Sequence, residues 1–304
     1  MDLTLRSFFS FFGRQASQQN RKERQNMLVT NGIASAQKQI EPGHQTRHPS
    51  AFLKGIVQTE YPLPKFDRMG FLPVFYYDNT SMTAAFTAAT KKVRALLPDP
   101  DMRLVEFRPG RCVAVISCFE YRDSDIDPYN EVSMAFLISH GRRSLPAVKL
   151  LKGLYDSCFE AYVWKLPVTT EIARWGGVEL YGFPKFVADI HFTRTAGTMA
   201  CRLACDNQHI LTLEGKVLKT SPRKKPLRYR AYSVKDGLPL CANVYTSARE
   251  FAQSMLPNSA RLTLGEHEIG RTLRNLDLAK MPLMYQYSPI NEVSLFGPRN
   301  LMDD

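Results

Sequence analysis

The stretch FVADIHFTRTAGTMACRLACDNQHILTLEGKV, residues 186–217, decides the fold class that the sequence predicts. Its segments FVADIHF and TMACRLAC each place apolar side chains at every second position, and the strand-like segment HILTLEGKV follows. Successive side chains of a β-strand point to opposite faces, so this alternation is typical of strands that cover a core with one face. We therefore expect consecutive strands whose apolar faces comprise Phe186, Ala188, Ile190 and Phe192, then Met199, Cys201, Leu203 and Cys205.

Similar short segments, rich in β-branched and aromatic residues, occur on both sides of this stretch at 71–77, 103–107, 112–119, 131–138 and 159–166. The triplet at 235–237, Lys-Asp-Gly, predicts a hairpin turn between two further strands, because glycine tolerates a positive φ. Helical spacing of apolar residues predicts a helix over 81–97, and 272–278 predicts a short helix or turn. The predicted fold class is α+β and predominantly β, with few helices and an antiparallel, sandwich or barrel-like sheet system.

The composition of the 304 residues, 44% hydrophobic and 23% charged, excludes a disordered, collagen-like or coiled-coil protein. No apolar run approaches the roughly 20 residues that a membrane-spanning helix needs, so we expect no membrane span. Residues 1–55 are polar, basic and aperiodic, and we predict that they form a mostly disordered extension. Residues 56–304 are predicted to form the single folded domain.

Cysteine and histidine residues give no sign of a metal or cofactor site, and we expect neither. The six cysteines are scattered without a CxxC pair, and the six histidines lack metal-ligand spacing. Cys201 and Cys205 lie four positions apart on a predicted strand, about 13 Å, which is too far for two ligands of one ion. Free thiols and the lack of a secretory signal near Asp2 predict a cytoplasmic protein.

The net charge of +11 includes a run of eight basic residues and no acidic residue between positions 216 and 235. Such a run can recruit nucleic acid, and Tyr229 and Tyr232 lie within it, as a binder of single-stranded RNA would require. No recognised nucleic-acid-binding module accompanies the run, and charge alone gives salt-sensitive, nonspecific affinity. We therefore rank nucleic-acid binding last and expect no specific nucleic-acid partner.

One segment, TTEIARWGGVELYGFPKFVADI at 169–190, stands out on chemical grounds. Lys185 follows Gly-Phe-Pro and precedes an apolar strand, which suggests burial of its side chain. Burial disfavours the charged form of a lysine and leaves an amine that can attack a carbonyl group. A lysine imine then accepts the electrons of a cleaved carbon–carbon bond. Glu171 or Glu179 could move protons, although a lysine after proline is more often a surface residue.

The sequence GGVELYGFPKFVA resembles the active-site signature of the acetoacetate decarboxylase family, and Lys185 occupies the position of the Schiff-base lysine. The segment Tyr129-Asn130-Glu131 resembles the Tyr-x-Glu motif of the family, whose glutamate is an active-site carboxylate. The likeness extends in the same order from about residue 61 to 299. It implies a decarboxylase that forms a Schiff base between Lys185 and a β-keto acid, a small-molecule partner, and a homo-oligomer, with Glu131 assisting the proton transfers.

The resemblance also implies a set of substrate-binding residues, for which we take Arg68, Tyr129, Glu179, Phe183 and Phe186. Several departures from the family pattern affect this set. Met69 stands where the family usually has an arginine, and Arg68 is one position away. Ile116 stands where a second glutamate is usual, Val178 replaces an arginine before Glu179, and Phe186 replaces a second lysine after Lys185.

These departures leave alternatives open. The loss of polar groups favours a bulkier, more apolar carbonyl substrate and a Schiff-base aldolase or dehydratase reaction. A non-catalytic member of the family that binds an apolar ligand is a third possibility. The presence of Lys185 together with Glu131 and Glu179 argues against this third possibility.

Overall fold

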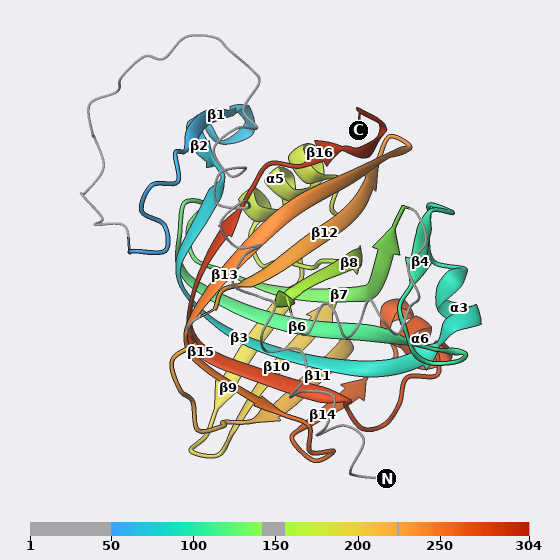
Figure 1. The fold of residues 1–304 in the computed structure, drawn as a ribbon. Helices are drawn as coiled ribbons and strands as arrows, with labels where there is room; N and C mark the ends of the chain where they lie inside the picture. Colours follow the sequence, from blue (N-terminus) through green and yellow to red (C-terminus); the bar gives the residue numbers. More distant parts are fainter. Residues whose placement is uncertain (1–49, 142–155, 224, 304) are drawn as a thin grey trace, which may run out of the picture. The chain divides into compact units, whose positions relative to one another are not determined.

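A computed structural model of the chain, shown in Figure 1, describes residues 50–141, 156–223 and 225–303. Most of the predicted N-terminal extension therefore lies outside the described residues. Seven strands of the described part pair in a ring, because β6 and β7 pair with each other as well as with their other neighbours. Around this barrel every pairing is antiparallel except that of β8 with β12. Its strands are β3 (Val74–Ala89), β6 (Arg111–Ser124), β7 (Tyr129–His140), β8 (Cys158–Lys165), β12 (Leu227–Lys235), β13 (Leu238–Ser254) and β15 (Met284–Leu295).

A second, four-stranded antiparallel sheet packs against the barrel wall and is formed largely by the stretch of alternating residues at 186–217. Its strands are β9 (Asp189–Arg194), β10 (Thr198–Cys205), β11 (Gln208–Lys216) and β14 (Ala260–Leu264). The remaining strands are short: β1 (Thr59–Leu63), β2 (Arg68–Leu72), β4 (Met102–Leu104), β5 (Glu106–Arg108) and β16 (Arg299–Asn300). The helices of the described part are α3 (Thr90–Arg94), α5 (Glu171–Tyr181) and α6 (Glu268–Asn275), with 3₁₀ turns η2 (Pro64–Phe66) and η3 (Leu301–Asp303).

The two faces of the barrel wall contact different parts of the molecule. Even-numbered residues of β6 and β7, such as Ile116 and Val132, pack against the apolar face of the four-stranded sheet. A barrel of about this size is filled by its own side chains, so the four-stranded sheet lies outside it. The opposite, odd-numbered face of β6 and β7 therefore points into the barrel, and this face carries Tyr121, Tyr129 and Glu131.

A bulge in β3 changes which of its side chains point into the barrel. The register of β3 against β6 shifts at Asp78, between Tyr76 and Asn79. Even-numbered residues of β3 beyond the bulge, such as Met82, face the four-stranded sheet, whereas Tyr76 packs with Tyr121 and Tyr129. A bulge of this kind re-aims a side chain, and here it turns Tyr76 into the barrel.

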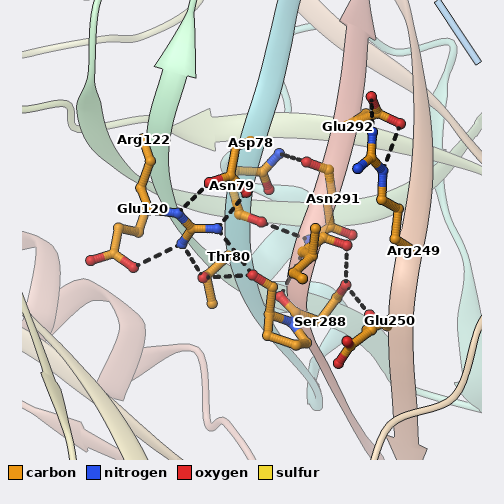
Figure 2. Close-up of polar contacts among 12 residues, drawn as sticks. Asp78, Asn79, Thr80, Glu120, Arg122, Arg249, Glu250, Ser288, Asn291 and Glu292 are labelled. Carbon is orange, nitrogen blue, oxygen red and sulfur yellow. Dashed lines mark hydrogen bonds and ion pairs between the residues drawn. The ribbon is translucent and has the colours of Figure 1, made fainter. Parts of the chain in front are cut away.

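A network of polar side chains holds this bulge in place, as Figure 2 shows. Two nitrogens of Arg122 on β6 donate hydrogen bonds to the two carboxylate oxygens of Asp78, at 2.6 and 2.7 Å. Asn79 donates to the backbone oxygen of Asn291 at 3.0 Å, where β15 has its own register shift. Bidentate arginine–carboxylate pairs fix geometry well, so this network fixes the direction in which Tyr76 points.

The predicted helix over 81–97 is wrong for residues 81–89. Residues 81–89 continue the long strand β3, and the helix α3 spans Thr90–Arg94. The segment fits both periods, but Met82, Ala84, Phe86 and Ala88 alternate onto the buried face that packs against the four-stranded sheet. Pairing with β6 and β15 on both sides therefore overrides the local helical spacing.

The predicted fold class and two local predictions agree with the structure. The fold class, α+β and predominantly β with a barrel and few helices, is confirmed. The hairpin turn at 235–237 joins β12 to β13, with positive φ at Asp236 and Gly237. The short helix predicted over 272–278 is the end of α6 and the turn after it. All six cysteines have free thiols, and no helix in the described part is long and apolar enough to span a membrane.

Candidate active site

Helix α5 and the four residues after it bring Lys185 into the barrel. The helix begins after Thr170 and ends at Gly182, whose φ of +60° gives the left-handed cap that glycine favours. Pro184 follows and cannot continue the helix. The extended segment that contains Pro184 pairs with residues 166–168, which follow β8 and lie beside β7. Leu166 donates its backbone N–H to the oxygen of Pro184, and Val168 donates to that of Phe186.

The side chain of Lys185 returns across α5 at a glycine. A Cβ atom on Gly177 would lie 2.3 Å from Cδ of Lys185 and 2.5 Å from its Cε. These distances are far below the 3.5–4.0 Å or so of ordinary carbon–carbon contact. The aliphatic part of Lys185 therefore occupies the space that any other residue at position 177 would fill. By contrast, a Cβ on the adjacent Gly176 would have no neighbour within 4 Å.

Lys185 and Glu131 form a buried ion pair. The Nζ atom of Lys185 donates to Oε2 of Glu131 at 2.8 Å, and the two side chains are 5% and 9% exposed. Glu131 lies on β7, where it pairs with Val168, and Val168 in turn pairs with the strand segment that follows Lys185. Removal of one partner from a buried pair costs about 3–5 kcal/mol, because the other charge is left unpaired. The two groups are therefore a candidate amine and proton acceptor held in direct contact.

Three buried tyrosines surround the carboxylate of Glu131. The hydroxyls of Tyr121 and Tyr129 lie 3.4 and 3.5 Å from its two oxygens, and the hydroxyls of Tyr76 and Tyr129 lie 3.1 Å apart. The Nζ atom of Lys185 also lies 5.6 Å from the centre of the Tyr129 ring. Burial, and then the charge of Glu131, raises the pKa of each of the three tyrosines well above its ordinary value. The three phenols therefore remain protonated and can act as donors.

A narrow cavity of about 40 Å³ lies next to Lys185. The strands β1 and β2 cover one side of it, and α5 forms another side. Most of its lining is apolar, which suits a ligand with a hydrocarbon part. The lining residues are Tyr61, Leu63, Gly70, Phe71, Leu72, Val74, Tyr76, Ile126, Ile172, Ala173, Gly176, Gly177, Leu180, Tyr181, Phe183, Lys185 and Leu295.

Arg68 lies beside this cavity with part of its guanidinium group unsatisfied. It shares a face of β2 with Gly70 and Leu72, which line the cavity, and it pairs across the hairpin with Leu63. Its Nη1 atom donates to Asp127 at 2.9 Å, whereas Nε and Nη2 are buried without a partner among the described residues. Buried N–H groups of an arginine need an acceptor, and a carboxylate supplies one in bidentate geometry.

The predicted site residues divide into two groups. Lys185, Glu131 and Tyr129 lie in contact, Phe183 lines the cavity, and Arg68 pairs with Leu63, which also lines it. The remaining two, Glu179 and Phe186, lie elsewhere, and the prediction for them needs correction.

Glu179 is 49% exposed and pairs with Lys235 at 3.5 Å. It follows Gly177 by two positions, about 200° around the helix, so it lies on the face of α5 opposite the cavity. Phe186 packs against the core between the barrel and the four-stranded sheet. Adjacent residues of an extended segment point in opposite directions, so the orientation of Lys185 into the barrel directs Phe186 outward.

Two residues that differ from the family pattern, Met69 and Ile116, also lie away from the cavity. Met69 is 45% exposed on the opposite face of β2 from Arg68, and Ile116 is buried outside the barrel wall. Neither residue lines the cavity. Glu171, the other glutamate considered from the sequence, binds Lys65 and Arg174 at the start of α5.

Sequence reasoning missed Tyr76, Tyr121, Tyr181 and the role of Gly177. The two glycines at 176–177 were a visible signal for close packing, because glycine in a helix interior is costly unless something needs the space. The tyrosines had no comparable signal, since the direction of Tyr76 depends on a bulge in β3 and that of Tyr181 on a helix that the sequence pattern did not indicate. Among the described residues, no group of three or more His, Cys, Asp or Glu side chains is placed to hold a metal ion.

The sequence matches a family model, and the fold is similar to those of solved structures. The family model for acetoacetate decarboxylase (ADC) matches residues 60–295, and a search of curated proteins found no match. Among solved structures, the chain is similar to acetoacetate decarboxylase from Legionella pneumophila, with 16% identity and a TM-score of 0.54 over 76% of this chain and 88% of that one. A second acetoacetate decarboxylase structure gives 14% and 0.53, over 75% and 89% of the two chains. The enduracididine biosynthesis enzyme MppR gives 14% and 0.54, over 76% and 88%.

At these identities the solved structures establish likeness of fold. The family match establishes family membership as well as fold, because it covers most of the chain. It extends from β1 to the end of β15 and so includes the strand of Glu131 and the segment of Lys185. The chain therefore belongs to the acetoacetate decarboxylase family.

Proposed function

We propose that the protein is a Schiff-base lyase that decarboxylates a small β-keto acid or a closely related carbonyl acid. The observation that carries this proposal is the contact between Lys185 Nζ and Glu131 Oε2, 2.8 Å apart, beside an apolar cavity. A buried amine with a proton acceptor in contact is the arrangement that imine formation needs. Acetoacetate decarboxylase is itself a well-known example of an activated lysine nucleophile, so the chemistry of this step follows the family.

The proposed reaction begins with a proton transfer from the Lys185 ammonium to Glu131, which frees the amine to attack the substrate carbonyl. Two of the three ammonium protons leave with the carbonyl oxygen as water, by way of Glu131, and the third stays on the iminium nitrogen. The iminium then accepts the electrons of the breaking carbon–carbon bond, and CO2 leaves. The resulting enamine carbon takes up a proton, and water hydrolyses the imine to release a ketone and restore Lys185.

The unsatisfied nitrogens of Arg68 favour a substrate that carries a carboxylate. Its buried Nε and Nη2 atoms lack acceptors among the described residues, and the carboxylate of a keto acid would supply two oxygens. The narrow cavity, about 40 Å³, favours a small carbonyl group beside Lys185.

A second candidate is an aldolase or dehydratase reaction on a bulkier, more apolar carbonyl compound. The apolar lining of the cavity favours it. MppR, which has a similar fold, was solved in complex with pyruvate, so this fold also accommodates a keto acid that is not a β-keto acid. The two candidates differ in what happens after the imine has formed.

The test is reductive trapping. We expect borohydride to attach the substrate carbon skeleton to Lys185 when acetoacetate, 3-oxohexanoate or pyruvate is present, as located by mass spectrometry. The K185R variant should lose the label, and K235R, which changes a lysine that contacts the outer side of α5, should keep it. CO2 release from the 3-oxo acids separates decarboxylation from the second candidate. A label that persists in K185R, or no label in the native protein with any of these acids, would overturn the proposal.

A further inference from the structure

Tyr181 has a buried hydroxyl with nothing to bind in the described part of the chain. The residue is 3% exposed, and its Oη atom has no hydrogen-bond partner among the described residues. Among the residues that line the cavity, it is the one with a side-chain donor that is both buried and unpartnered. Leaving such a group unsatisfied is costly, and native proteins rarely do so without a reason.

The position of Tyr181 relates it directly to Lys185. It follows Gly177 by four residues, so both lie on one face of α5, the face that Lys185 crosses. The ring of Tyr181 stacks on Phe183 with their centres 5.3 Å apart, and this contact holds the ring in place. Tyr181 and Lys185 therefore line the same cavity from one face of α5.

We propose that Tyr181 is a catalytic residue, whose hydroxyl donates a hydrogen bond to the oxygen of the carbonyl group that Lys185 attacks. This inference rests on the proposed function, since it requires a carbonyl ligand at Lys185.

The other groups near the amine are less suited to donate to the carbonyl oxygen. Glu131 is a carboxylate and accepts hydrogen bonds, so it would repel the negative charge that develops on the carbonyl oxygen. The hydroxyl of Tyr76 is already paired with that of Tyr129 at 3.1 Å. Burial raises the pKa of Tyr181 far above its ordinary value, so its phenol keeps its proton and remains a donor.

A donor held in advance at the developing charge needs no reorganisation during the reaction. Removal of one such donor typically lowers the rate about 10²–10³-fold. The missing partner in the free protein has a second consequence. Because the hydroxyl of Tyr181 has no partner among the described residues, its loss should leave the Tm of the free protein unchanged or raised.

The experiment compares Y181F with Y285F. Tyr285 is also buried, and its hydroxyl also lacks a partner among the described residues, but it lies in the core between the barrel and the four-stranded sheet. Both variants remove one unsatisfied hydroxyl and keep the ring. The readouts are the rate of borohydride trapping at Lys185 with acetoacetate, 3-oxohexanoate and pyruvate, and Tm without ligand.

We expect the trapping rate of Y181F to fall about 10²-fold or more, with Tm equal to or above that of the native protein. Y285F should also have a Tm equal to or above that of the native protein, but its trapping rate should be unchanged. A Y181F protein that traps as fast as the native one would overturn the inference and leave the proposed function standing. A fall in both the Tm and the trapping rate of Y181F would show that the hydroxyl of Tyr181 has a packing role, and this result would also overturn the inference. Failure of the native protein to trap any of the three acids would overturn the proposed function, and this inference with it.

Discussion

Replacement of Gly177 by alanine should show that the reactivity of Lys185 depends on the space that this glycine leaves. The added Cβ would stand 2.3 Å from Cδ of Lys185, so the lysine chain must move by more than 1 Å to reach ordinary contact of about 3.5 Å. The lysine chain is flexible, so the fold can absorb this movement. Its amine, however, would leave its position 2.8 Å from Glu131.

A misplacement of about 1 Å at a reacting group can cost about 10²-fold in rate, which corresponds to about 2.7 kcal/mol. Alanine is also the better helix former, by about 0.8–1.0 kcal/mol relative to glycine. G176A is the matched control, since it gains the same helix propensity and its Cβ meets no atom within 4 Å. We expect G176A to have native trapping rates and a raised free energy of unfolding.

G177A should trap at least about 10²-fold more slowly than G176A, with a lower free energy of unfolding because its buried ion pair is loosened. The assays are borohydride trapping with acetoacetate and urea unfolding of both variants. Equal trapping rates in the two variants would refute the argument that Gly177 makes room for the reactive lysine.

Three further predictions concern Arg68, Phe186 and Glu171. R68Q should weaken binding of a keto acid by about tenfold to a hundredfold, through the loss of charge-assisted hydrogen bonds worth about 1.5–3 kcal/mol, and should spare its methyl ester; equal losses for acid and ester would contradict the assigned contact. F186Q should lower the free energy of unfolding by about 1–3 kcal/mol and leave the trapping rate unchanged, because Phe186 packs outside the barrel; a slower rate at unchanged stability would speak against this placement. Hydrogen bonds from Arg174 and then Lys65 lower the pKa of Glu171 to about 2, so its contribution to stability is present above pH about 4.5 and is lost as the pH falls toward 2. The difference in urea midpoint between the native protein and E171Q should therefore shrink over that interval, and a difference that stays constant down to pH 3 would exclude the linkage.

Period-two patterning predicted much of the sheet because it reports directly on burial. The alternation in 186–205 matches β9 and β10, whose apolar faces pack on the barrel wall. The same signal was present in 81–89 but coincided with helical spacing, and pairing with two neighbouring strands decided between them. Helix α5 was not predicted, because two adjacent glycines lower local helix propensity and their reason, the space for Lys185, exists only in the folded protein.

The site could be predicted as far as local sequence constrains it. The Gly-Phe-Pro-Lys segment and the Tyr-x-Glu segment each identify residues that the structure brings into contact. Directions of neighbouring side chains were harder. Phe186 lies next to Lys185 in sequence and on the other side of the barrel wall in space, whereas Tyr76 reaches Tyr129 through a bulge that Asp78 and Arg122 hold.

The unsatisfied polar groups around the cavity indicate what kind of ligand completes it. The charges of Lys185 and Glu131 are already matched to each other, so a ligand need not bring a charge to balance them. Within the described part of the chain, the groups left without partners beside the cavity are donors: the hydroxyl of Tyr181 and two nitrogens of Arg68. A ligand that offers acceptor oxygens would satisfy these donors, whereas an ammonium group or an amide N–H would not. A carbonyl oxygen near Lys185 and a carboxylate near Arg68 are the acceptors of an oxo acid, and the apolar lining accepts the carbon chain. The free protein is thus short of acceptor oxygens, and this shortage favours a keto acid over a neutral apolar compound as its substrate.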